Sequence, residues 1–258
     1  MALFDTHCHL DFAALQPHKE TIKVSLETGV ERFMVPTTTR SSWSLVKNLA
    51  QQYPQNIFYA LGLHPYFLSD EVPTLDLQTL SEQLNKKTRQ VVAVGECGLD
   101  AMISVSQEVQ ERVFVAQIGL ALEHHLPIVL HSRKTHHRIL QLLKQHHFNL
   151  GGVLHGFTGS EQQARQFIDM GFKIGVGGSI TYPRANKTRT AIAALPIDAL
   201  VLETDAPDMP LNGFQGQPNT PARLPIVLTT LADLRGDEPS MLEQQLWQNS
   251  LSLFHLRK

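Results

Sequence analysis

Eight short apolar segments, each followed by a longer segment with helical spacing, run from one end of the chain to the other. They recur about every 30 residues, which is the length of a strand–helix unit. Short segments that are nearly all apolar are typical of strands buried on both faces of a parallel sheet. The predicted strands are 3–7, 32–36, 57–63, 91–96, 127–131, 152–155, 172–176 and 200–204.

The segments between these strands have the apolar periodicity of helices that bury one face. Val109, Val113, Ala116 and Leu120, for example, recur at positions that share one side of a helix. Eight strands that alternate with helices predict an α/β fold, a closed parallel (β/α)8 TIM barrel, in one domain over residues 1–258. An open, doubly wound parallel sheet is the alternative.

The composition is that of an ordinary globular protein, with 42% hydrophobic and 18% charged residues. A formal net charge of −2 gives no overall attraction to nucleic acid or membranes, so any phosphate recognition has to be local. The N-terminus has no signal pattern, and no segment is apolar enough to span a membrane. Two cysteines, Cys8 and Cys97, provide no disulfide framework. We therefore expect a cytoplasmic protein.

Histidines and carboxylates stand at or just beyond the ends of most predicted strands. Side chains alternate along a strand, so His7 and His9 point the same way. In a barrel, the strand ends meet at the C-terminal rim, where such enzymes keep their active sites. Buried polar side chains there must be hydrated, paired or bound to metal. Each residue alone is more typical of a structural role, but the set predicts a metal centre: His7, His9, His64, Glu96, His131, His155 and Asp205.

The number of these side chains exceeds what one structural zinc site needs, and the paired cysteines of such a site are missing. The set suits two divalent cations that share a carboxylate, which is an arrangement for hydrolysis. Imidazole and carboxylate ligands suit Zn, Mn or Fe(II). We expect Asp205 also to take the proton of the nucleophile. The predicted arrangement has Glu96 as the bridge, His7, His9 and Asp205 on one ion, and His131 and His155 on the other.

Six ordered motifs, which extend over nearly the whole chain, strongly resemble those of the TatD family of metal-dependent deoxyribonucleases. That family belongs to the wider group of amidohydrolase-like barrels. The motifs are DTHCHLD at 5–11, GLHP at 62–65, GECGLD at 95–100, HSR at 131–133, HGFTGS at 155–160 and ETDAP at 203–207.

The resemblance implies a distorted TIM barrel of the metallo-dependent hydrolase type that hydrolyses phosphodiester bonds with two divalent ions. Such enzymes commonly act from the 3′ end of DNA, so DNA, single-stranded or at a 3′ end, is the expected partner, and Mg or Mn are the expected activating ions. The resemblance also implies that His64 contacts the scissile phosphate and is not a primary metal ligand. The ligand roles would fall to His7, His9, Glu96, His131, His155 and Asp205.

The chain departs from the family pattern without losing a ligand. Ala101 and Met102 stand where an aromatic and a basic residue are usual, Gly156 replaces a cysteine, and Ser252 replaces a frequent basic residue. The first of these changes alters the rim of the expected substrate cleft. It therefore puts substrate preference in doubt, and not hydrolysis.

Several residues next to the predicted ligands have expected supporting roles. Arg133, two residues after His131, is a predicted phosphate contact. Glu203 shares a strand face with Asp205, so we expect it to orient a ligand or a metal-bound water. Tyr66 and Phe67 suit either stacking on a base or packing under a loop, and we favour packing. Turn formation accounts for Asp100. Further cations on the same side either hold phosphates or belong to a solvated helix face: Lys134, Arg184, Lys187, Arg189 and Arg223.

Two rival functions remain open. Related barrels also house metal-dependent amidases, lactonases and phosphotriesterases that act on small molecules. The residue at position 96 is a glutamate, and not the lysine that often bridges metals in those relatives, which argues against this alternative. A metal-free binding protein would be expected to have lost ligands, and none is lost here.

Overall fold

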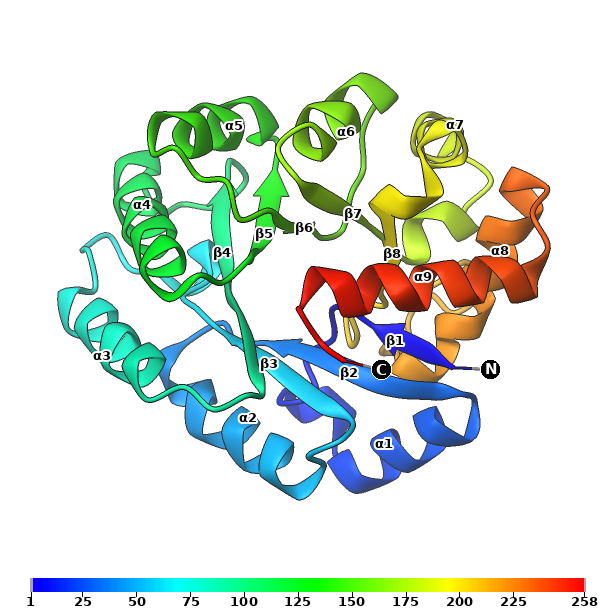
Figure 1. The fold of residues 1–258 in the computed structure, drawn as a ribbon, viewed down its shortest axis with the longest axis horizontal. Helices are drawn as coiled ribbons and strands as arrows, with labels where there is room; N and C mark the ends of the chain where they lie inside the picture. The colour runs from blue at the N-terminus through cyan, green and yellow to red at the C-terminus, as the bar shows by residue number, and fades with distance from the viewer. Residues whose placement is uncertain (1, 258) are drawn as a thin grey trace.

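Eight parallel strands form one sheet, and their order in the sheet is their order in the sequence. The computed structural model describes residues 2–257 (Figure 1). All eight predicted strands are present; the fourth and fifth end later than predicted, and the first, third, sixth and eighth end earlier. The strands are β1 (Leu3–Asp5), β2 (Val30–Pro36), β3 (Ile57–Leu61), β4 (Val91–Asp100), β5 (Ile128–Arg133), β6 (Gly152–Leu154), β7 (Phe172–Val176) and β8 (Leu200–Leu202).

Helices follow the strands and lie outside the sheet (Figure 1). The sequential order confirms the TIM-barrel type of α/β fold and excludes a doubly wound sheet, whose strand order reverses. No helix of residues 2–257 is long and apolar enough to cross a membrane. The α-helices are α1 (His18–Glu27), α2 (Arg40–Gln52), α3 (Thr74–Asn85), α4 (Gln107–His124), α5 (His136–Gln145), α6 (Glu161–Ile168), α7 (Asn186–Ala194), α8 (Leu224–Arg235) and α9 (Pro239–Leu253), and the 3-10 helices are η1 (Ala13–Leu15), η2 (Pro65–Phe67), η3 (Gly178–Thr181), η4 (Ile197–Ala199) and η5 (Pro221–Arg223).

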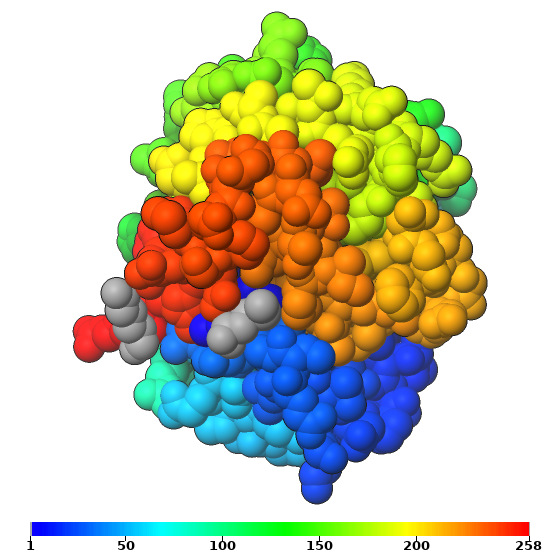
Figure 2. Space-filling view, turned by 90° about the vertical axis from the view of Figure 1, so that its right-hand side faces the viewer, coloured from blue at the N-terminus to red at the C-terminus, as the bar shows by residue number. Residues whose placement is uncertain are grey.

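The seam between β1 and β8 is irregular, which makes the barrel a distorted one. Among the described residues no continuous ladder joins these strands, but His9 N–H donates to Ala206 O at 2.7 Å. The buried Asp5 carboxylate reinforces the seam, because it accepts from Thr204 N–H at 3.0 Å and bonds the Thr204 hydroxyl at 2.6 Å. Burial raises the pKa of Asp5 to about 7. Figure 2 shows the start of the chain next to α8 and α9.

Helix α9 closes the end of the barrel at which the strands begin. Its side-chain amide, Asn249 Nδ2, donates to Ile197 O and Leu200 O at the start of β8. Leu251 and Phe254 pack against barrel-facing side chains such as Phe4. The opposite end, where the strands finish, is therefore the end that remains available for a site.

Candidate active site

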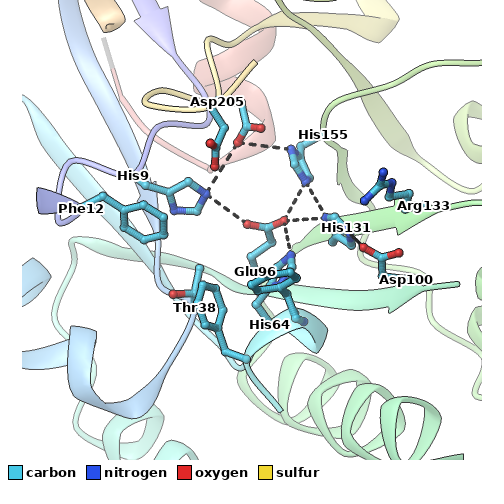
Figure 3. Close-up of a pocket in the computed structure, with 13 residues that line it drawn as sticks. His9, Phe12, Thr38, His64, Glu96, Asp100, His131, Arg133, His155 and Asp205 are labelled. Atoms are coloured by element: carbon cyan, nitrogen blue, oxygen red, sulfur yellow. Dashed lines mark hydrogen bonds and ion pairs between the residues drawn. The ribbon is translucent and has the colours of Figure 1, made fainter. Parts of the chain in front are cut away.

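The predicted site residues meet in a cavity of about 330 Å³ at the end of the barrel where the strands finish (Figure 3). Glycines allow the strand that carries Glu96 to lie close to its neighbour. Gly95 has φ +143°, and a Cβ there would lie 2.7 Å from Val129 O in β5. Seven of the residues predicted from the sequence line this cavity: His9, His64, Glu96, His131, Arg133, His155 and Asp205.

Glu96 lies at the centre of the site, and its two oxygens face different groups of histidines. Oε2 lies 3.2 Å from His7 Nε2 and 3.5 Å from His9 Nε2. Oε1 lies 2.7 Å from His155 Nε2 and 3.2 Å from His131 Nδ1. Figure 3 shows this carboxylate between His9 on one side and His131 and His155 on the other. This is the geometry that a carboxylate shared between two cations requires.

His7, His9 and Asp205 form a compact group on the Oε2 side of Glu96. The two Nε2 atoms lie 3.3 Å apart, as the predicted common orientation of these histidines requires. Asp205 Oδ1 lies 3.4 Å from His7 Nε2 and 3.6 Å from His9 Nε2. Two ligands bound tetrahedrally at about 2.1 Å lie about 3.4 Å apart, so these donors fit one metal ion. The ring of His155 stacks on His7 and links this group to the other.

His131 has one ring nitrogen committed to a carboxylate that the sequence analysis did not assign to the site. Its Nε2 lies 3.2 Å from Asp100 Oδ2, a contact in which Nε2–H donates, and this leaves Nδ1 as the nitrogen that faces Glu96 and would ligate a metal. Asp100 also accepts from Met102 N–H at 2.7 Å, which confirms its predicted role in a turn. The sequence did indicate that Asp100 faces the site, because Asp100 and Glu96 are four residues apart in one strand and share its face.

His64 has the opposite proton arrangement. Its Nδ1 accepts a hydrogen bond from Tyr66 N–H at 3.0 Å, at the start of η2. The proton of the neutral ring is therefore on Nε2, which lies 3.1 Å from Glu96 Oε1. An N–H at this position donates to a carboxylate or phosphate oxygen and offers no lone pair to a metal. The geometry thus agrees with a substrate contact better than with a ligand, although His64 belongs to a ligand-sized cluster with Glu96 and His131.

Charge in the site is strongly perturbed because the groups are buried. Burial raises the pKa of Asp205 to about 7, although His155 opposes the shift. Burial would also raise the pKa of Glu96, but the surrounding imidazoles, His155 first, hold that pKa well below its usual value. Burial lowers the pKa of His9 to about 4. Burial alone would lower the pKa of His155, but the neighbouring Glu96 carboxylate outweighs it and raises that pKa to about 10. Buried carboxylates surrounded by imidazoles, with interligand distances that suit a metal, fit divalent cations.

Glu203 supports the segment that carries His155. Its Oε1 accepts from Gly156 N–H at 2.5 Å, so it holds the turn directly after β6. Its Oε2 has no hydrogen-bond partner within residues 2–257, and burial raises the pKa of this carboxyl to about 8. Gly175 in β7 leaves space for the Glu203 carboxylate, because a Cβ at position 175 would lie 2.1 Å from Oε2.

The rim of the cavity is aromatic and exposed. Tyr66 is 63% exposed and Phe67 is 47% exposed, and both line the cavity. The preferred interpretation of these two residues as packing under a loop was therefore wrong. Phe12, whose ring stacks on His9, and Asp208 also line the cavity, and the sequence analysis identified neither of them. Cys8 and Cys97 are fully buried in the apolar core, as expected.

Imidazoles and carboxylates gathered at the open end of a (β/α)8 barrel define a metal-dependent hydrolase type of site. The family model of TatD-related DNases matches residues 4–255. The chain is 45% identical to an uncharacterised metal-dependent hydrolase of Escherichia coli, YjjV, over 98% of this chain and 97% of that protein. It is 35% identical to the 3′–5′ ssDNA/RNA exonuclease TatD of Klebsiella pneumoniae, over 92% and 91%.

A solved structure agrees with these sequence matches. The crystal structure of E. coli YjjV superposes with a TM-score of 0.94 at 44% identity, over 99% of this chain and 98% of that one. The chain belongs to the TatD family of metal-dependent hydrolases.

Proposed function

We propose that this TatD-family hydrolase is a nuclease that uses two divalent cations to remove nucleotides from the 3′ end of DNA. The observation that carries the proposal is the position of Glu96, whose two oxygens face separate groups of histidines. A relative at 35% identity is named a 3′–5′ ssDNA/RNA exonuclease, which supports a nucleic-acid substrate.

We propose the same division of donors between two ions as in the sequence analysis, which the distances around Glu96 support. His7, His9 and Asp205 would hold one ion and His131 and His155 the other, with Glu96 shared. Zn, Mn or Mg bound there would supply Lewis acidity and a nucleophile at neutral pH. Asp100 fixes the His131 ring so that Nδ1 is the ligand atom. Glu203 holds the turn after His155 through Gly156 N–H.

Three side chains would then act on the substrate. His64 Nε2–H donates to a non-bridging oxygen of the scissile phosphate, because its Nδ1 is occupied by Tyr66 N–H. The exposed guanidinium of Arg133 lines the same cavity and neutralises phosphate charge. The Asp205 carboxylate, whose Oδ1 lies 3.4 Å from His7 Nε2 and so beside the first ion, accepts the proton of the attacking water.

The test is a time course on a 5′-labelled single-stranded oligonucleotide with Mg, Mn, Zn or a chelator. We expect a metal-dependent ladder that shortens from the 3′ end. The Asp205→Asn variant should keep its circular dichroism spectrum and lose the ladder. Near-wild-type cleavage by this variant would remove the role assigned to Asp205.

Absence of cleavage by the wild-type protein with every metal would refute the nuclease proposal. The substrate would then be sought among small phosphoesters, amides and lactones. Labelled RNA of the same sequence, run in parallel, determines whether the enzyme distinguishes the two sugars.

A further inference from the structure

A second cavity, of about 500 Å³, adjoins the first at the metal-ligand cluster. His131, Arg133, His155 and Asp205 line both cavities, so the two meet where the scissile phosphate would lie. In Figure 3, Arg133 lies beyond His131 and His155, on the opposite side of Glu96 from Phe12 and His9. A strand bound across the cluster would therefore occupy both cavities, one on each side of the cleaved bond.

The two cavities differ in charge. Apart from the shared residues, the second cavity is lined by two exposed lysines, Lys134 and Lys187, and by no further carboxylate. Neither lysine forms an ion pair within the described part of the chain. The first cavity instead has Asp100 and Asp208 beside Glu96 and Asp205. Phosphates are attracted to the second cavity and repelled by the first.

The two cavities also differ in their apolar surface. Phe12, Tyr66 and Phe67 line the first cavity, and the Tyr66 and Phe67 rings lie edge to face with centroids 5.2 Å apart. Exposed aromatic rings offer a stacking surface to any base. The first cavity thus suits one terminal nucleoside that has no phosphate beyond it, and for the exonuclease proposed above this is the 3′-terminal nucleoside.

We propose that the second cavity is a phosphate subsite for the retained strand, while the first cavity takes the 3′-terminal nucleoside that leaves. Lys187, in the first turn of α7, and Lys134, directly after β5, hold the phosphate on the 5′ side of the penultimate nucleoside. This inference rests on the proposed nuclease function, takes its 3′ to 5′ direction from it, and assigns one cavity to each side of the cleaved bond. It also makes a free 3′-hydroxyl, and not a 3′-phosphate, the preferred end.

Thymidine dinucleotides test the subsite with one phosphate at a time. The dinucleotide TpT carries only the scissile phosphate. The dinucleotide pTpT adds a 5′-phosphate, and TpTp adds a 3′-phosphate. For the wild-type enzyme we expect the KM for pTpT to be about tenfold below that for TpT, which corresponds to one charge-assisted contact. The KM for TpTp should lie above that for TpT.

A matched pair of lysine variants distinguishes a specific phosphate contact from a general effect of positive surface charge. Lys187→Ala should abolish most of the preference for pTpT over TpT. The control, Lys144→Ala, removes an exposed lysine from the last turn of α5. This is the end of α5 that is farther along the chain from Lys134, so the preference should stay intact. Both positions are exposed, so folding should be unaffected in either variant.

The outcomes distinguish this inference from the function on which it rests. Cleavage of TpT with equal KM values for TpT and pTpT, or with TpTp preferred, would overturn the subsite and its polarity while the nuclease proposal stands. If no dinucleotide is cleaved, calorimetric binding of analogues with a non-hydrolysable phosphonate linkage replaces the kinetics. Equal affinities of the analogues with and without the 5′-phosphate would then refute the subsite independently of catalysis.

Discussion

An alanine at position 175 would place its Cβ 2.1 Å from Glu203 Oε2 and 2.5 Å from Glu203 Cδ. The backbone at Gly175 is not left-handed, so alanine itself fits there and the conflict is confined to the carboxylate. To restore an ordinary contact, the carboxylate must retreat by more than 1 Å. This movement would break its 2.5 Å hydrogen bond with Gly156 N–H.

The expected loss in the free energy of unfolding of Gly175→Ala has two parts. Overpacking a filled interior costs about 1–3 kcal/mol, and leaving a buried N–H without its acceptor costs about 1–3 kcal/mol. We therefore expect Gly175→Ala to lower the free energy of unfolding by about 3 kcal/mol. We also expect weaker metal binding, because the turn that Glu203 holds directly follows His155.

Urea denaturation of a double-mutant cycle, in the presence of chelator, isolates the interaction. In a Glu203→Ala background the carboxylate is gone, so Gly175→Ala should cost less than about 0.5 kcal/mol, which gives a coupling of about 2 kcal/mol or more. Gly177→Ala is the control, because its Cβ would lie at an ordinary 3.4 Å from Glu203 Cγ. An equal cost of Gly175→Ala in both backgrounds would refute this explanation.

Three further predictions concern the seam, the rim and the ions. Asp5→Ala leaves Thr204 N–H and its hydroxyl without their acceptor and should cost about 3 kcal/mol in urea denaturation, whereas Asp5→Asn, which can bond both groups, should cost less than half as much. Arg133→Ala should raise the KM for DNA and reduce the salt slope of binding by about 1, and an unchanged slope would mean that Arg133 is not a phosphate contact. Mn at about a thousandfold its Kd should stabilise the wild-type protein by about 4 kcal/mol for each ion bound, and hence by about 8 kcal/mol for two, in thermal denaturation, and no shift in Tm would contradict binding to the folded state.

The strands could be predicted because they are nearly continuous apolar segments, and the residues of the candidate site because they stand where those segments end. The predicted proximity of His7 and His9 is confirmed, but not the strand on which it was based, because β1 ends at Asp5 and both residues lie beyond it. The barrel type follows from eight repeats of one unit. These features depend on local pattern, which a single sequence contains.

Other features depend on contacts between distant segments. Asp100 reaches His131 only because β4 continues to residue 100 and pairs with β5. The proton arrangement of His64 depends on the η2 turn, which brings Tyr66 N–H to Nδ1. The charge difference between the two cavities arises where the segments after β5 and β7 meet, and no spacing within either segment indicates it.

Anomalous X-ray diffraction from crystals soaked with Mn tests the central claim most directly. We predict two anomalous peaks, one beside His7, His9 and Asp205 and one beside His131 and His155, with Glu96 between them. A single peak, or a peak bound through His64 in place of His131 and His155, would contradict the account.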